Sequence, residues 1–462
     1  MITDPPVLAA ERIRLVWIAL IILVCFSFLI THFYFLQILE GDKWILKANK
    51  QHFFTVKEPF RRGIFYSNTS IKKGHPLLFQ RLVIDVPKFH MYVDPESIPL
   101  HLRDEMAEHL LAYLNLIPHD QAHLRLQFDK HSRSRQLAMW LDKENQQLIQ
   151  KWWQGYAQQN KIPRNALFFL KDYQRSYPFG KLLGQVLHTI QSHKDEKTNE
   201  AHPTGGLELY FDKYLKGKQG KRRLMRSPRN SFAMGEIIYH PEHGADIYLT
   251  IDHCLQAIVE EEVEKGVKKC KAKSGWAAMM NPYTGEILAL AQYPFFFPAD
   301  YGHYFKETAL IEHTKVKAIT DANEPGSVFK PFTVALAMKA DQHLQQKGEK
   351  SLFNPEEKIA TSNGHFPGRS RPIQDTRVHY YLNLDMGMQK SSNIYMARLA
   401  ERLIARLGNE WYRRQLQVFG FGEKTRIELP AESAGVTYSW KMSRQWSFRM
   451  VDPYPIFTGY GT

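Results

Sequence analysis

Glu324-Pro325-Gly326-Ser327-Val328-Phe329-Lys330-Pro331-Phe332 is the stretch of this sequence that says most about its fold and chemistry. Pro325-Gly326 predicts a turn, and the apolar run that begins at Thr333 predicts a helix after it. Proline is tolerated in the first turn of a helix, so Pro331 places Ser327 at the helix N-terminus. Ser327 and Lys330 are then expected on one face, because residues three apart are neighbours on a helix.

This spacing can support nucleophilic chemistry without a histidine. A serine hydroxyl can pass its proton to a lysine amine if burial lowers the lysine pKa enough to make the amine neutral. Ser-x-x-Lys is short, however, and roughly one or two copies are expected by chance in such a chain. A second copy, Ser70-Ile71-Lys72-Lys73, runs into Gly74-His75-Pro76 and is predicted to be a solvated loop. The pattern alone leaves open whether Ser327 is a nucleophile or an ordinary surface serine.

Length and composition indicate a folded protein of two or three domains. The chain has 462 residues, 44% of them hydrophobic, and a net charge of +14. Its basic residues are scattered, and no zinc-finger, RNP or helix-turn-helix pattern accompanies them. We therefore predict no nucleic-acid partner. A solvated basic face, or attraction to an anionic membrane or polymer, explains the charge better.

Cysteine and histidine spacing excludes several site classes. The chain has three cysteines, too few for a disulfide framework, and Cys254 and Cys270 fall far apart on one predicted helix. Neither Cys-x-x-Cys nor His-Glu-x-x-His occurs in the sequence. We predict no metal site and no cofactor.

The N-terminus carries a candidate membrane anchor. Residues 15–36 are almost wholly apolar, and as a helix they would be about 33 Å long, enough to cross a bilayer core. A cleaved signal peptide would have a shorter apolar core and a small-residue cleavage site, which favours an uncleaved signal-anchor here. A buried core helix is the alternative, and the length argues against it. Arg12 and Arg14 precede the span, while Lys43 and Lys47 follow it, so charge does not decide the orientation.

Two further regions follow the predicted span. Residues 37–240 mix short strands, such as Leu82–Val86 and Met91–Val93, with amphipathic helices expected at Leu100–Ile117 and Trp140–Trp153. These elements indicate a mixed α/β region.

Around residue 241 the sequence pattern changes to a strand followed by a long helix. Asp252 is a plausible N-cap for this helix, whose predicted apolar face includes Leu255, Ile258, Val259, Val263, Val267 and Cys270. A β-hairpin is predicted from Trp276 to Ala291, so this region reads as an antiparallel sheet with helices packed on it.

A second constellation lies downstream of Ser327. Ser391-Ser392-Asn393 is followed by the apolar helix pattern that begins at Ile394. Serine and asparagine are favoured helix caps, so this could be only a cap. A hydroxyl and an amide at the edge of a cleft can also relay a proton and hold a substrate amide.

The two motifs together resemble those of the class B penicillin-binding proteins, peptidoglycan transpeptidases of the serine acyl-transferase superfamily. The resemblance covers nearly the whole chain, through blocks at 36–41, 58–65, 206–220, 249–256 and 419–430. The Ser-Ser-Asn form of the second motif is similar to division-type members, whereas elongation-type members commonly carry Ser-x-Asp. The resemblance implies an α+β fold: a single transmembrane helix, an elongated mixed α/β pedestal and a penicillin-binding domain. We expect a cytoplasmic tail at 1–14, the anchor at 15–36, the pedestal at 37–240 and the transpeptidase domain at 241–462.

The resemblance also implies roles for the motif residues. Ser327 would attack a D-alanyl-D-alanine carbonyl of a stem peptide, and Lys330 would be its base. Ser391 would relay a proton to the departing D-alanine, and Asn393 would bind the acyl chain's amide. β-Lactams would acylate Ser327 and remain. The protein would lie in the inner membrane as a single-pass protein with its C-terminal domain in the periplasm, beside division-complex proteins and a glycan polymerase.

One family motif is missing from the sequence. A Lys-Ser/Thr-Gly strand is expected well beyond the Gly-Phe-Gly block, and the sequence ends at Thr462 before that point. Lys424-Thr425-Arg426 precedes a different block and is not this motif. We expect a transpeptidase domain incomplete at its C-terminus, and losing one oxyanion donor typically costs about 10²–10³ in rate. Two alternatives therefore stay open: a non-catalytic, membrane-anchored division scaffold, and a β-lactam sensor or β-lactamase of the same superfamily.

Overall fold

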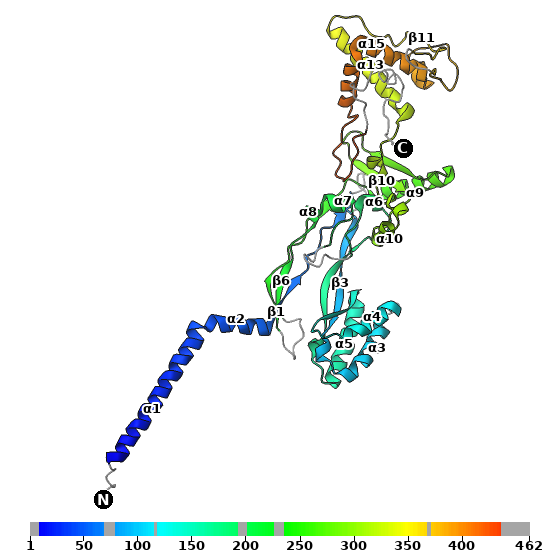
Figure 1. Cartoon of the computed structure of the whole chain (residues 1–462). Helices are drawn as coiled ribbons and strands as arrows, with labels where there is room; N and C mark the ends of the chain where they lie inside the picture. The colour runs from blue at the N-terminus through cyan, green and yellow to red at the C-terminus, as the bar shows by residue number, and fades with distance from the viewer. Residues whose placement is uncertain are drawn as a thin grey trace. The chain divides into compact units, whose positions relative to one another are not determined.

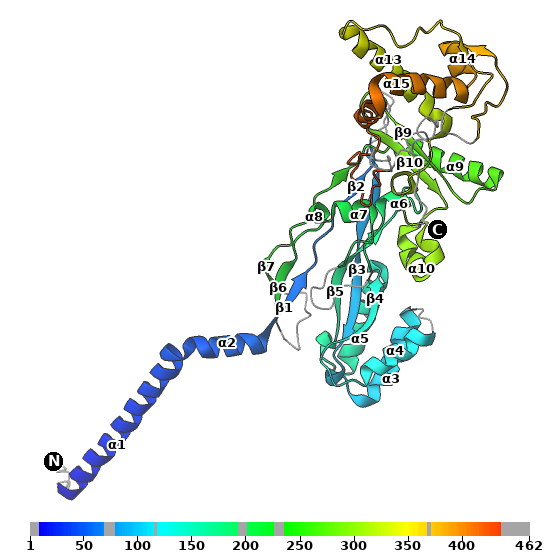
Figure 2. The same ribbon diagram turned by 45° about the horizontal axis from the view of Figure 1, so that its top comes forward.

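The computed structural model describes residues 9–68, 79–114, 118–192, 201–225, 235–366 and 371–435. The predicted loop at Ser70–Lys73 lies outside these ranges. The chain divides into two compact units: Met1–Ile64, Val83–Ser176 and Tyr214–Ile247 form unit 1, and Phe65–Leu82, Tyr177–Lys213 and Tyr248–Thr462 form unit 2. Figures 1 and 2 show the elements of both units.

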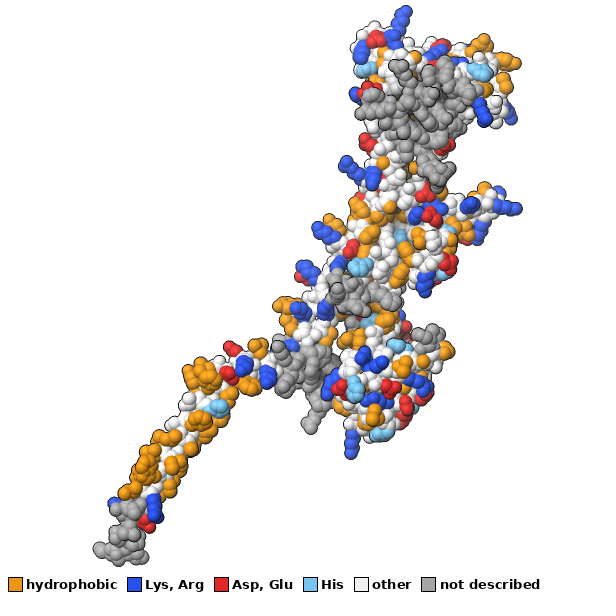
Figure 3. Space-filling view, viewed as in Figure 1, with side chains coloured by type: hydrophobic (Ala, Val, Ile, Leu, Met, Phe, Trp, Pro, Cys, Tyr) orange, Lys and Arg blue, Asp and Glu red, His pale blue; other side chains and the backbone are white. Residues whose placement is uncertain are grey.

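The N-terminal apolar stretch is helical, as predicted. Helix α1 spans Ala9–Tyr34 and continues through a π-helical turn, Phe35–Leu39, before α2 (Gly41–His52). Within Glu11–Leu39, an 18-residue window has a mean hydropathy of 2.8, and no part of that window is buried in the protein. Orange apolar side chains cover α1 in Figure 3. By length and composition this helix can cross a membrane.

The remainder of unit 1 is built around two antiparallel sheets. Its further elements are β1 (Phe53–Glu58), β3 (Arg81–Val93), η2 (Pro95–Ser97), α3 (Leu100–Leu114), α4 (Pro118–Phe128), β4 (Arg135–Leu141), α5 (Lys143–Gln159), η3 (Arg164–Ala166), β5 (Leu167–Ser176), β6 (Gly220–Met225) and β7 (Gly235–Tyr239). Strand β6 lies between β1 and β7, with Phe53 opposite Met225 and Glu58 opposite Gly220. Strand β3 lies between β4 and β5.

Two predictions from the sequence differ from the structure of this unit. The strands predicted at Leu82–Val86 and Met91–Val93 are parts of the single strand β3, which continues through Pro87. The helix predicted at Trp140–Trp153 begins only at Lys143, because the preceding residues form β4 and pair with β3. The helix expected at Leu100–Ile117 is confirmed over its described part, Leu100–Leu114. It buries Leu102, Met106 and Leu110 in a core shared with Ile149 and Trp153 of α5.

The described part of unit 2 contains a β-hairpin, short strands and helices, and three long helices, α9, α13 and α15. Its elements are β2 (Phe65–Tyr66), α6 (Gly184–Leu187), α7 (Gly206–Tyr210), α9 (His253–Cys270), β9 (Gly275–Met280), β10 (Ile287–Tyr293), η4 (Pro298–Asp300), α10 (Tyr301–Lys306), α11 (Thr308–Ile311), α12 (Lys317–Thr320), η5 (Gly326–Phe329), α13 (Lys330–Gln346), β11 (Ile359–Ala360), β12 (Tyr381–Leu382), α14 (Leu384–Gln389) and α15 (Asn393–Val418). Helix α8 (Asp212–Leu215) and strand β8 (Ile247–Tyr248) lie at the unit boundaries.

The predicted hairpin and its helix are confirmed, but the buried face of the helix differs from the prediction. Asp252 caps α9 by accepting from the amides of Cys254 and Leu255. Ile258 is exposed, whereas Gln256 and Glu260 are buried. The Gln256 side-chain amide both accepts from and donates to the backbone of Leu290 in β10, so a polar contact replaces the expected apolar one.

Helices α13 and α15 share the core that supports the candidate site. Leu336, Ala337 and Ala340 of α13 pack with Tyr395, Leu399 and Leu403 of α15, and Phe329 joins the same cluster. All seven are buried. The apolar spacing read from the sequence around Thr333 and Ile394 therefore faces one shared interior.

Candidate active site

The Ser327 motif forms one turn of 3₁₀ helix, η5, that leads directly into α13. The Lys330 amide donates to the carbonyl of Ser327, which closes the turn. Side chains three apart eclipse one another in a 3₁₀ helix, so Ser327 and Lys330 share a side more closely than in an α-helix. Pro331 lies in the first turn of α13, as expected.

Phe329 anchors this turn. Its ring is 1% exposed and contacts the rings of Phe332 and Phe421, with centroids 5.9 and 5.3 Å away. Ser327 and Val328 are exposed on the other side of the turn. Phe329, in the middle of Ser-x-x-Lys, thus fixes the backbone of this turn in the core, while Ser327 stays exposed. The sequence reading did not single out Phe329.

Lys330 has the burial that the proposed base requires. The residue is 3% exposed, and burial lowers the pKa of its amine, while the negative charge of Asp375 acts in the opposite direction. Its Nζ donates to Ser391 Oγ at 2.9 Å and to the Ser391 carbonyl oxygen at 2.5 Å. The two sequence motifs therefore meet at this amine.

Ser391 occupies an unusual backbone position. Its φ is 52°, in the left-handed region that favours glycine. Helix α14 ends here in a Schellman motif: the Ser391 amide donates to Met388, and the Ser392 amide donates to Gly387. The third residue of the motif, Asn393, is half-buried and donates from Nδ2 to the Gln374 carbonyl at 2.9 Å.

Asp375 is a member of this cluster that sequence reasoning missed. Its carboxylate accepts from the Ser392 hydroxyl at 2.5 Å and from the amides of Asn393 and Ile394 at 2.6 and 3.1 Å. Ser392 is buried and is the N-cap of α15. No local pattern around Asp375 indicates this contact, because the carboxylate and the helix that it caps come from separate segments.

Three of the four predicted residues thus lie close together. Lys330 contacts Ser391, and Asn393 follows two residues later at the start of α15. The Ser327 hydroxyl makes no hydrogen bond to Lys330 or Ser391 within the described residues. Its position on the same turn as Lys330 is what links it to the cluster.

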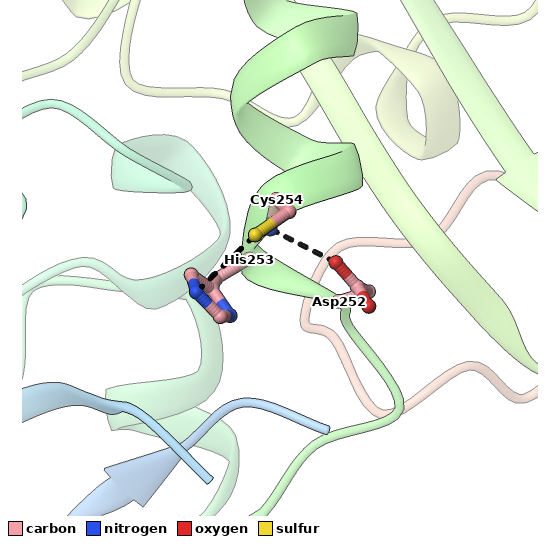
Figure 4. Close-up of side chains that lie close together, drawn as sticks. All are labelled: Asp252, His253 and Cys254. Carbon is pink, nitrogen blue, oxygen red and sulfur yellow. Dashed lines mark hydrogen bonds between the residues drawn. The ribbon is translucent and has the colours of Figure 1, made fainter. Parts of the chain in front are cut away.

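A second group of reactive side chains lies at the start of α9 (Figure 4). Ligand atoms of Asp252, His253 and Cys254 lie within 4.8 Å of one another. The Asp252 carboxylate already caps the helix, and the three residues are consecutive. Helix capping explains the aspartate, so we assign no metal to this group.

Lys424-Thr425-Arg426 is irregular backbone rather than a strand. The amides of Thr425 and Arg426 donate to the Glu432 carboxylate, at 2.6 and 3.1 Å, instead of to a neighbouring strand. This local loop agrees with the expectation that the segment is not the third motif of the family.

Two family models match the chain. The penicillin-binding protein dimerisation domain matches residues 80–249, and the penicillin-binding protein transpeptidase domain matches residues 275–461. The second match contains Ser327, Lys330, Asp375 and Ser391. The described helices and hairpin of unit 2 agree with the α+β fold class expected from the sequence.

Among curated proteins, the peptidoglycan D,D-transpeptidase FtsI of Buchnera aphidicola is 28% identical, covering 96% of this chain and 69% of the relative. The crystal structure of penicillin-binding protein 2X from Streptococcus thermophilus has a TM-score of 0.65 at 18% identity, covering 87% of this chain and 57% of that one. A structure described as "Structural coordination of polymerization and crosslinking by a peptidoglycan synthase complex" has a TM-score of 0.58 at 20% identity, covering 94% and 71%. At these identities the solved structures show the fold alone.

The chain spans 69% of the length of that FtsI and between 43% and 66% of several other curated transpeptidases that it matches. The matched models nevertheless lie in the order expected for one architecture, with the dimerisation domain ahead of the transpeptidase domain. The Ser-x-x-Lys and Ser-Ser-Asn motifs contact each other through Lys330 and Ser391, and the FtsI of Buchnera aphidicola is similar along almost the whole chain. The chain belongs to the class B penicillin-binding proteins, of the division type.

Proposed function

We propose that this chain is a peptidoglycan D,D-transpeptidase that cross-links stem peptides through a serine acyl-enzyme. The observation that carries the proposal is the buried amine of Lys330. This amine donates a hydrogen bond to Ser391, and Lys330 lies on the same turn as the exposed Ser327. A lysine can act as a base only when its amine is neutral, and burial shifts the equilibrium towards that form.

The first step forms the acyl-enzyme. Ser327 Oγ attacks the carbonyl carbon of the penultimate D-alanine, and its proton passes to the neutral Lys330 amine. The bond to the terminal D-alanine nitrogen then breaks. That nitrogen takes a proton from the Ser391 hydroxyl, which is replenished from the Lys330 ammonium 2.9 Å away. Free D-alanine leaves, and the stem peptide stays on Ser327 as an ester.

The second step transfers the acyl group. An amine from a neighbouring stem peptide attacks the ester carbonyl and loses a proton through the same Lys330–Ser391 pair. The Ser327–acyl bond breaks, and the serine regains its proton. Asn393, at the start of α15, would orient the acyl chain by hydrogen bonding to its amide. A β-lactam follows the first step only: its ring amide opens onto Ser327, and the leaving nitrogen stays tethered to the acyl group.

A fluorescent penicillin tests this function directly. We expect membranes containing the full chain to form one labelled band, with mass spectrometry locating the adduct on Ser327. Ser327→Ala should abolish the band, whereas Ser70→Ala removes the serine of the other Ser-x-x-Lys and should leave it unchanged. A folded preparation that takes no label would reject the enzyme and favour the anchored scaffold. Rapid release of hydrolysed penicillin would instead favour a β-lactamase.

We further propose that α1 anchors the protein in the inner membrane, with the rest of the chain in the periplasm. The apolar stretch Leu15–Ile30 of α1, broken only by Ser27, supports the anchor, and long C-terminal domains are exported largely regardless of charge. Protease added to spheroplasts should then degrade everything beyond α1. Full protection of the chain until the membrane is dissolved would place it on the cytoplasmic side.

Division-complex proteins and a glycan polymerase are the partners that fit this proposal. The support is the division-type relative and the structural likeness to a component of a synthase complex. Crosslinking in dividing cells, followed by affinity purification through the full chain, should recover a polytopic glycan polymerase. Recovery of no glycan polymerase from cells in which the chain is crosslinked would reject this partner.

A further inference from the structure

We propose that Asp375 is a positioning residue that fixes the Ser391–Asn393 turn against Lys330. The proposal rests on the proposed transpeptidase function and concerns the same site. Asp375 lies in an irregular segment before β12, and α15 begins well after it. Its carboxylate is the only group in the described part of the chain that hydrogen-bonds to three consecutive residues of the second motif region, Ser392 to Ile394.

The geometry of these bonds explains how the turn is held. Asp375 Oδ1 accepts from the first two amides of α15, which have no partner within the helix. Asp375 Oδ2 accepts from the Ser392 hydroxyl, which in turn accepts from the Tyr395 amide at 3.0 Å. Both carboxylate oxygens are therefore used. A negative charge at this end of a helix is also favoured by the helix dipole.

Ser391, which directly precedes the three residues bound by Asp375, is the residue that most needs this support. Ser391 has a left-handed backbone conformation that disfavours a non-glycine residue. The Schellman motif of α14 holds it from one side, and Asp375 holds the next three residues from the other. With both sides fixed, the Ser391 carbonyl and hydroxyl point at Lys330 Nζ. Without Asp375, this backbone could relax and carry both groups away from the amine.

Asp375 also acts on Lys330 through its charge. Lys390 ends α14 and Arg398 lies on α15, but of the charged groups in the described residues only the Asp375 carboxylate contributes to the shift in the Lys330 pKa. The shift is upward and opposes the larger effect of burial. Removing the charge should therefore make the amine neutral at lower pH, while removing the hydrogen bonds should misplace Ser391. Substitutions of Asp375 can separate the effect of its charge from the effect of its hydrogen bonds.

The test measures acylation by benzylpenicillin across pH in the full chain. Asp375→Asn keeps the shape and loses the charge, so the acid limb of the rate profile should move to lower pH. Asp375→Glu keeps the charge and loses the fit, so the limb should stay in place while the maximal rate falls about 10- to 100-fold. Asp385→Asn is the matched control, because Asp385 is exposed in the first turn of α14 and should change neither.

Hydrogen exchange provides a readout that does not need activity. In Asp375→Glu and Asp375→Ala, which lose the fitted hydrogen bonds, peptides covering residues 392–397 should exchange faster than in wild type, and Asp385→Asn should not change them. Unchanged exchange in both Asp375 variants would overturn the proposal, as would a pH profile for Asp375→Asn identical to wild type. If the wild-type chain takes no penicillin, the proposed function fails, while the exchange result still decides whether Asp375 holds the turn.

Discussion

The Lys330 amine nitrogen lies 2.9 Å from the Ser391 hydroxyl oxygen, although 61 positions separate the two residues in the chain. The same amine also donates to the Ser391 carbonyl oxygen. One side chain therefore contacts both the backbone and the hydroxyl of the second motif. This contact joins the start of α13 to the end of α14, and it makes the two motifs a single chemical unit.

The backbone at Ser391 should favour glycine over a residue that carries a Cβ. Its left-handed φ costs a non-glycine residue about 1 kcal/mol. We expect Ser391→Gly to be about 1 kcal/mol more stable than Ser391→Ala, while both lose penicillin acylation about equally. Thermal unfolding and labelling rates measure the two effects. Equal stability of the two variants would mean that the backbone at this position is not strained.

Lys330 should show a similar conflict between activity and stability. Burying an amine disfavours its charged form, so Lys330→Met removes a desolvation cost while filling nearly the same volume. We expect acylation to fall by about 10²–10⁴, with stability at neutral pH unchanged or higher. Denaturant midpoints and labelling rates are the measurements. Lys339→Met, on the same helix but exposed, is the control and should leave acylation unchanged. Marked destabilisation by Lys330→Met would show that the lysine is primarily structural.

His188 should make unit 2 sensitive to acid. Burial lowers the pKa of His188 to about 4 from 6.5, and the ring is fixed by the Thr314 carbonyl and the Thr204 hydroxyl. The unfolded chain thus binds a proton between pH 6.5 and 4 that the folded chain does not. The contribution of neutral His188 to the free energy of unfolding is therefore fully present above pH 6.5. The free energy of unfolding should fall by about 3 kcal/mol by pH 4.

Urea titrations of His188→Gln across this range should show a flatter pH dependence than wild type. His303→Gln changes an exposed histidine on α10 and should leave the wild-type slope intact. If His188→Gln retains the full acid slope, other groups must account for it.

Gly63 should tolerate no side chain. A Cβ there would lie 1.8 Å from the Ala245 carbonyl oxygen, an atom of the backbone that cannot move aside cheaply. We expect Gly63→Ala to destabilise unit 1 by about 3 kcal/mol. Gly155→Ala is the opposite control: Gly155 is an exposed position of α5 with nothing within 4 Å of an added Cβ, and the change should stabilise by about 0.5–1 kcal/mol. Thermal melts of the two variants should therefore move in opposite directions.

The sequence predicted those elements whose signals are local. The apolar run of α1, the Asp252 cap of α9, the hairpin β9–β10 and the turn before α13 follow from residue spacing and cap chemistry. The predicted helix and strand boundaries were wrong where pairing with a distant strand outweighed the local sequence pattern. The residues Arg135–Leu141 join β4 because β3 offers an open ladder, although their spacing also fits a helix. The domain limits predicted at residues 36/37 and 240/241 stay predictions.

The sequence by itself determined which residues are chemically capable: a serine and a lysine one turn apart, and a second serine and an asparagine ahead of a helix. Only the tertiary structure decided that Lys330 is buried, that its amine contacts Ser391 rather than Ser327, and that Asp375 holds the second motif. The reason is that spacing along a chain fixes contacts only within a turn or two. Burial, and hydrogen bonds between distant segments, depend on how the α13–α15 core packs, which no local pattern encodes.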